Sequence, residues 1–100
     1  IEWSRVPLIG GVRDLAAQGH VTGASGRNWA GYGADVDLPE GFAAEDRALL
    51  TDPQTSGGLL VACAPEVVAE VIEVFRRDGF ADAAEVGTIG RAGEARLRVR

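Results

Sequence analysis

The sequence predicts an α/β (α+β) fold: a single layer-type domain in which helices cover a mixed sheet. Three patterns lead to this prediction. Residues 59–64 form a short, wholly apolar run, which is typical of a buried strand. Residues 68–75 carry apolar side chains at helical spacing. Residues 95–100 alternate between apolar and charged side chains, as a half-buried strand does. A chain of 100 residues fits one small domain of this kind.

The first third of the chain predicts a strand, a helix and an irregular segment. Residues 1–6 alternate like a strand, and residues 12–18 have the apolar spacing of a short helix that Gly19 would end. Residues 20–28 are rich in turn-forming residues and are expected to be irregular. A single helical turn is expected over residues 29–32.

The middle of the chain predicts a loop over residues 35–41 and a helix over residues 43–50, which are good helix formers. A polar loop over residues 52–58 then leads into the strand at 59–64. The best-defined helix begins near Pro65, where proline is tolerated in a first turn, and ends before Gly79. Its apolar face consists of Val68, Val71, Ile72 and Phe75.

The C-terminal part predicts a hairpin: a strand over residues 84–89, a turn over 90–94 and a strand over 95–100. The element order is therefore β-α-loop-α-β-α-β-β. One face of the last strand carries three arginines, which we expect to be solvated and to find acidic partners across the strand. These are Arg96, Arg98 and Arg100.

Composition restricts the classes of function. The net charge of −5 argues against a nucleic-acid binder, and no apolar run approaches the roughly 18 residues of a membrane span. The acid-rich residues 31–58 are interpreted as a solvated face, with metal attraction as the alternative. Cys63 is expected to be a buried structural thiol rather than a nucleophile, and His20 a loop histidine. A single cysteine is compatible with the cytoplasm.

Two residue types are absent. The sequence contains no methionine and no lysine, and it opens on an alternating pattern. We therefore expect a piece of a longer protein, and any chemistry that needs a lysine to hold phosphates would take that lysine from elsewhere.

The polar loop at residues 52–58 is the first candidate site. It combines a carboxylate, an amide, two hydroxyls and two glycines, and a glycine-rich backbone lets a ligand approach its N–H groups. The alternative is a plain connection between a helix and a strand, since the same residue types form turns. The candidate residues are Asp52, Gln54, Thr55, Ser56, Gly57 and Gly58.

Residues 23–28 are the second candidate. Ser25, Arg27 and Asn28 supply a hydroxyl, a guanidinium and an amide among glycines, which suits an anion. The alternative is a surface loop in which Asn28 caps the following helical turn.

The residues of both candidates resemble a known family. Residues 50–60 look like the signature segment of the selenophosphate synthetases (selenide, water dikinases). Residues 23–28 are similar to that family's Gly-Gly-Thr-x-Arg-Asn segment, with Ala24 and Ser25 in place of its Gly and Thr. The tail at residues 86–90 is also similar, and the spacing fits throughout the chain.

The resemblance implies membership of the aminoimidazole ribonucleotide (AIR) synthetase superfamily, with residues 1–100 as a partial C-terminal domain. The parent enzyme would convert ATP, selenide and water into selenophosphate, AMP and phosphate in the cytoplasm, as a homodimer, without nucleic-acid or membrane partners. The absent N-terminal domain would hold ATP and Mg²⁺, and an N-terminal segment would carry the catalytic cysteine or selenocysteine and a lysine. No catalytic or metal-binding residue is therefore assigned here, and the chain alone is expected to be inactive.

Two other interpretations stay open at this point. The chain could belong to another ATP-using enzyme of the superfamily, although the intact signature at residues 52–58 argues against this. It could also be a stand-alone binding module.

Overall fold

The computed structural model describes residues 1–93 and 96–100 and combines helices with a small parallel sheet. The predicted α/β class is thereby confirmed, with a sheet smaller than expected. The helices are α1 (Val12–Ala17), α2 (Gly23–Tyr32), α3 (Ala44–Leu50) and α4 (Val68–Arg77). Short 3-10 turns occupy Trp3–Arg5, Gly33–Asp35 and Pro65–Val67, and the strands are β1 (Val36–Asp37) and β2 (Leu97–Arg98).

The sheet pairs β1 with β2 in parallel, with Val36 opposite Leu97 and Asp37 opposite Arg98. The predicted C-terminal hairpin is therefore wrong, because β2 takes its partner from the segment that was expected to be a loop. Residues 94–95, the end of the predicted turn and the start of the predicted strand, lie outside the described residues. Val99, 2% exposed, anchors the end of β2, and its N–H donates to the Asp37 carbonyl oxygen at 2.9 Å.

The arginines of the last segment have acidic neighbours, as predicted. The side chains of Arg96 and Asp35 approach to 3.6 Å, those of Arg98 and Asp37 to 3.0 Å. All of them are largely exposed, so the face is solvated and each pair contributes little to stability.

The first six residues do not form the expected strand. The chain turns through the 3-10 segment Trp3–Arg5, which lets the buried indole of Trp3 pack edge-on against Phe42, with 5.7 Å between ring centroids. The backbone at this end still bonds to the C-terminus: the Trp3 N–H donates to Arg100 O at 2.8 Å, and the Arg100 N–H to Ile1 O at 2.9 Å.

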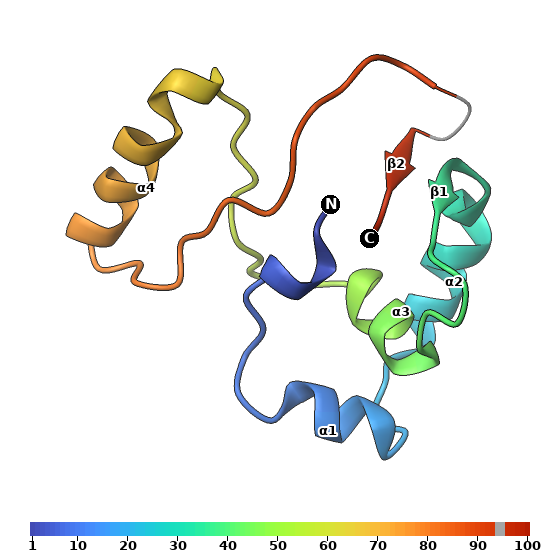
Figure 1. Cartoon of the computed structure of the whole chain (residues 1–100). Helices are drawn as coiled ribbons and strands as arrows, with labels where there is room; N and C mark the ends of the chain where they lie inside the picture. The colour runs from blue at the N-terminus through green and yellow to red at the C-terminus, as the bar shows by residue number, and fades with distance from the viewer. Residues whose placement is uncertain (94–95) are drawn as a thin grey trace.

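Helices α1, α2 and α3 form the larger group of elements (Figure 1). The Arg13 guanidinium of α1 donates two hydrogen bonds, of 2.7 and 2.9 Å, to the Asp46 carboxylate of α3. These bonds, with the charge of Asp46, raise the pKa of Arg13. The raised pKa of Arg13 contributes stability that is present below the ordinary arginine pKa and is lost as the pH rises into strong alkali, so this contribution does not change near neutral pH. Gly19, with φ +89°, ends α1 as predicted.

Helix α2 occupies a segment that we expected to be mostly irregular, and that expectation is wrong. Thr22, rather than Asn28, is the N-cap: its Oγ1 accepts a hydrogen bond from the Ser25 N–H at 3.3 Å. The cap satisfies a free N–H of the first turn and offsets part of the low helix propensity of the glycines. Packing on α3 adds to this, with the guanidinium carbon of Arg47 lying 5.3 Å from the centroid of the Trp29 ring.

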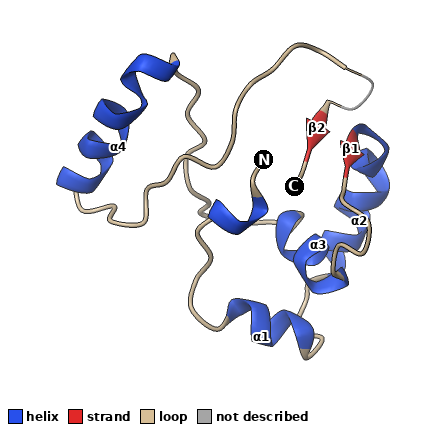
Figure 2. Cartoon of the chain, viewed as in Figure 1, coloured by secondary structure: helices blue, strands red, loops and turns tan. Residues whose placement is uncertain are grey.

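Helix α4 confirms the sequence pattern, with Pro65 in the preceding turn and Gly79, at φ +97°, just beyond its end. It stands apart from α1–α3, joined to them by long loops (Figure 2). The radius of gyration of 14.7 Å accordingly exceeds the roughly 13 Å of a compact 100-residue domain.

The strands predicted at residues 59–64 and 84–89 are absent from the described structure, which assigns both segments no regular secondary structure. A strand needs a ladder of backbone hydrogen bonds to a neighbouring strand, and β1 and β2 pair with each other instead. The Val86 carbonyl oxygen accepts a single bond from the Glu2 N–H at 2.8 Å, which does not make a ladder. Leu59 and Leu60 are 83% and 80% exposed, and Cys63, expected to be buried, is exposed. His20 lies in a loop, as predicted. Within the described residues, no helix is long and apolar enough to cross a membrane.

Candidate functional site

The Asp52–Gly58 segment is an irregular loop that leaves the C-terminal end of α3, as predicted. All seven of its residues are exposed. Within the described chain, the side chains of Asp52, Thr55 and Ser56 make no hydrogen bond to the protein. The loop thus presents a carboxylate and two hydroxyls to solvent, where an incoming ligand could meet them.

Gln54 behaves differently from the other polar residues of the loop. Its side chain folds back over Gly57, so a Cβ added at Gly57 would lie 2.8 Å from Gln54 Oε1 and 3.4 Å from Gln54 Cβ. A Cβ added at Gly58, by contrast, would have no other atom within 4 Å. A side chain at Gly57 would therefore displace the Gln54 side chain from this position, whereas the backbone at Gly58 is open to approach.

The structure brings part of the second candidate segment to the base of this loop. Ser25 and Asn28 lie on α2, and both contact Thr51, the residue that directly precedes Asp52. Asn28 Nδ2 donates to Thr51 O at 3.0 Å, and Thr51 Oγ1 lies 3.2 Å from Ser25 O. The side-chain hydroxyl of Ser25 faces Thr22 Oγ1 at 3.2 Å and is buried. Both residues thus support the chain around the loop.

Arg27, the third residue of the second candidate segment, does not contact the base of the loop as Ser25 and Asn28 do. Its guanidinium lies over the start of its own helix, with Nη1 at 3.6 Å from the position of a Cβ at Gly23. The residue is exposed, and in the described chain no hydrogen bond or ion pair joins it to residues 52–58. It remains available to an anion approaching from solvent.

Thr51 is the residue that sequence reasoning missed. It is only 3% exposed, and its hydroxyl donates within α3 to Arg47 O at 2.9 Å. A signal was present: a threonine directly after a run of good helix formers can bond back to the carbonyl four residues earlier.

The charge around the loop is modest, and Asp52 is its single carboxylate. Within the described residues there is no group of three or more histidines, cysteines, aspartates or glutamates that could hold a metal ion. Among the described residues, the loop therefore does not meet a carboxylate cluster that could hold Mg²⁺ without further ligands. Of the acidic middle segment, Asp35, Asp37 and Asp46 each face an arginine.

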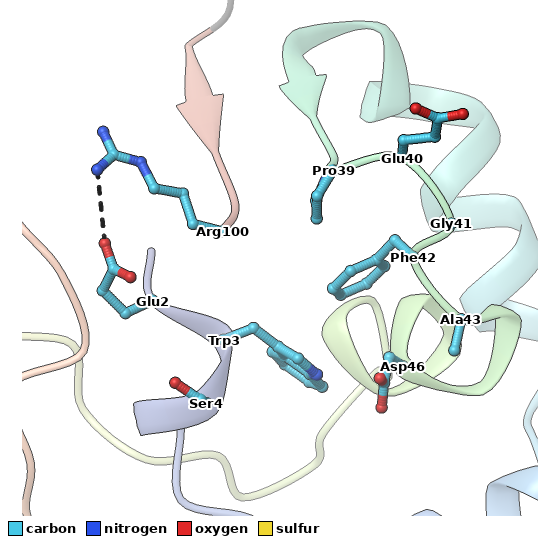
Figure 3. Close-up of a pocket in the computed structure, with 10 residues that line it drawn as sticks. All are labelled: Glu2, Trp3, Ser4, Pro39, Glu40, Gly41, Phe42, Ala43, Asp46 and Arg100. Carbon is cyan, nitrogen blue, oxygen red and sulfur yellow. Dashed lines mark ion pairs between the residues drawn. The ribbon is translucent and has the colours of Figure 1, made fainter.

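A pocket lies apart from the residues of the two candidate segments (Figure 3). It has a volume of about 440 Å³ and lies between Trp3, Phe42 and Arg100, with Glu2 paired to Arg100 at 3.8 Å across its edge. The buried Trp3 Nε1 has no hydrogen-bond acceptor among the described residues. None of the candidate site residues of either loop lines this pocket.

Comparison with known proteins defines the class to which this fold and loop belong. Residues 6–100 match the family model described as AIR synthase related protein, C-terminal domain, and the chain belongs to that family.

Within that class the chain is similar to proteins named selenide, water dikinase. It is 59% identical over 87 residues to the one from Burkholderia pseudomallei (strain K96243), which covers 87% of this chain and 25% of the relative. It is 52% identical over 99 residues to the one from Burkholderia cenocepacia, covering 99% of this chain and 28% of the relative. It is 53% identical over 96 residues to the one from Rhizobium meliloti (strain 1021), covering 96% of this chain and 27% of the relative. The chain spans about a quarter of the length of these relatives. The resemblance seen in residues 50–60 is confirmed.

Proposed function

We propose that the complete protein carrying this chain is a selenide, water dikinase, which converts ATP, selenide and water into selenophosphate, AMP and phosphate. The observation that carries the proposal is the 59% identity over 87 residues to a protein of that name. The intact loop Asp52–Gly58 supports it, because its exposed hydroxyls and glycines suit a polyphosphate or its product.

We propose further that residues 1–100 act as a partial C-terminal domain of a longer, homodimeric enzyme of the cytoplasm. In this proposal a separate N-terminal domain binds ATP and Mg²⁺ and supplies the nucleophile and lysine, and neither nucleic acid nor a membrane takes part. The length of the relatives, about four times that of this chain, supports a further domain. So does the exposed apolar surface, since exposed apolar patches commonly mark interfaces. It includes Leu59, Leu60, Val61, Phe80 and Ile89.

The loop has a physical role in this proposal. Hydroxyl groups at Thr55 and Ser56 can donate to phosphate oxygens. The backbone N–H of Gly58 can do so without a side chain in the way, and that of Gly57 can do so once the Gln54 side chain moves aside. Donors fixed before the reaction stabilise charge that develops on a transferring phosphoryl group. Asp52 and Gln54 shape the entry of the loop, and Arg27 adds a positive charge for an arriving anion. Mg²⁺, bound by the other domain, would neutralise phosphate charge.

The test is product analysis by ³¹P NMR on the complete protein with ATP, Mg²⁺ and selenide under reducing conditions. The proposal predicts selenophosphate and AMP in equal amounts, and neither product from the 100-residue chain alone. ADP as the nucleotide product, or AMP formed without any need for selenide, would instead point to another ATP-using enzyme of the superfamily. Selenophosphate made by the 100 residues alone would contradict the assignment of the catalytic groups to another domain.

A further inference from the structure

The peptide unit between Thr51 and Asp52 marks an abrupt change in the chain. Thr51 is 3% exposed, whereas Asp52 and every residue of the loop after it are exposed. The chain therefore passes from a packed helix end to a solvent-facing loop across one peptide bond. The direction of that bond sets where the loop projects, because a peptide unit is planar and moves as one body.

Both polar groups of this peptide unit are held. Its carbonyl oxygen, on Thr51, accepts a hydrogen bond from Asn28 Nδ2 at 3.0 Å. Its N–H, on Asp52, donates to Leu49 O at 3.3 Å. A carbonyl at the end of a helix has no donor within the helix, so the bond from α2 supplies a partner that α3 cannot.

The Thr51 side chain adds a third restraint. Its hydroxyl has one proton, and the acceptors within reach are Arg47 O at 2.9 Å and Ser25 O at 3.2 Å, with Ala48 O at 3.4 Å. The closest acceptor belongs to α3 and the next to α2. Thr51 is therefore held against both helices just before the loop begins, and Pro53 limits the backbone conformations of Asp52 immediately after it.

We propose that Asn28 and Thr51 are positioning residues. They clamp the Thr51–Asp52 peptide unit and thereby fix the direction in which the Asp52–Gly58 loop presents Thr55 and Ser56. This inference rests on the proposed function for the catalytic effect of the clamp. It assigns one N–H of the Asn28 amide to the protein backbone, where it donates to Thr51 O, rather than to a phosphate.

The clamp is tested in the complete protein with Asn28→Asp and Thr51→Val, which keep side-chain shape and remove the donor. Hydrogen exchange of the Asp52 amide, measured against the amides of α4, reports on the clamp itself. Loss of one such bond should speed that exchange about tenfold while α4 is unchanged. In Thr51→Ser, which keeps the hydroxyl, the Asp52 amide should exchange as fast as in the wild type. Ser25→Ala is the matched control, because it removes a hydroxyl but keeps the carbonyl that faces Thr51.

Kinetics then report on positioning. The clamp predicts that kcat falls about tenfold or more in Asn28→Asp and Thr51→Val, with KM for ATP within about twofold of wild type. Thr51→Ser should restore most of kcat. Unchanged exchange at Asp52 in both variants would overturn the clamp, and faster exchange with unchanged kcat would overturn its positioning role. A wild-type protein that makes no selenophosphate would refute the proposed function instead, and the exchange measurement would still decide whether the clamp exists.

Discussion

Asn28 Nδ2 donates a hydrogen bond across 3.0 Å to the carbonyl oxygen of Thr51, 23 positions later in the chain. This bond connects α2 to the end of α3 at the point where the candidate loop begins. The two polar segments that stand out in the sequence are thus joined through the protein backbone. The α2 segment supports the base of the loop, and its Ser25 hydroxyl is buried. The hydroxyls of Thr55 and Ser56 in the loop face solvent.

Packing between α2 and α3 predicts that Gly33→Ala is destabilising. Gly33 has ordinary helical backbone angles, with φ −60° and ψ −24°, so alanine is allowed by the backbone. Its Cβ, however, would lie 2.7 Å from Trp29 Cε2, and the ring would have to leave its place beside Arg47. We expect a loss of about 1–3 kcal/mol in the free energy of unfolding, measured with urea.

Gly31→Ala is the matched control for that variant. It lies in the same region of α2, and an added Cβ there meets nothing within 4 Å. Replacing an unconstrained helical glycine by alanine should stabilise the protein by about 0.5–1 kcal/mol. Equal effects of the two substitutions would show that the Trp29 contact is not what decides the cost at Gly33.

Within the loop, the contact between Gln54 and Gly57 predicts a coupled pair. Gly57→Ala should displace the Gln54 side chain, because the added Cβ would stand 2.8 Å from Gln54 Oε1. In a Gln54→Ala background the same substitution should cost less. A double-mutant cycle on unfolding free energy should give a coupling of about 0.5–1 kcal/mol. Additive effects would mean that the two residues do not share the space.

The neighbouring residues Arg98 and Val99 should differ sharply in how much unfolding free energy is lost when each is replaced by alanine. Val99 is 2% exposed, and Val99→Ala should cost about 1–3 kcal/mol of unfolding free energy. Arg98 pairs with Asp37 at 3.0 Å, but both side chains are more than half exposed. Arg98→Ala should therefore cost less than about 1 kcal/mol, and still less in 1 M salt. A larger loss for Arg98→Ala than for Val99→Ala would contradict the account of this segment.

The elements predicted well from the sequence were those determined by local pattern. Helix α4 has an apolar face at helical spacing and a proline at its start, and α3 consists of good helix formers. The loop at Asp52–Gly58 carries enough glycine, proline and short polar residues to exclude regular structure. Its residues also identified the family, which depends on their order in the sequence and not on folding.

The errors concern elements that depend on distant partners. The glycines of α2 favour turns, and only the Thr22 cap and contacts with α3 explain its helix. The pairing of β2 with β1, rather than with residues 84–89, depends on chain segments some 60 residues apart. The role of Thr51 requires knowing that α2 passes beside it. Alternation and propensity describe single segments and do not contain this information.

The most direct test of the central claim is the turnover of the complete protein with Thr55→Ala and Ser56→Ala combined. Both side chains are exposed and make no hydrogen bond within the described chain, so folding should be unaffected. The double variant Ser4→Ala and Thr88→Ala removes two exposed hydroxyls outside the loop and serves as the control. We predict a fall in kcat for selenophosphate formation of about a hundredfold in the loop variant, as for lost transition-state donors, with the melting temperature unchanged. Wild-type kcat in the loop variant would contradict the claim that this loop belongs to the active site.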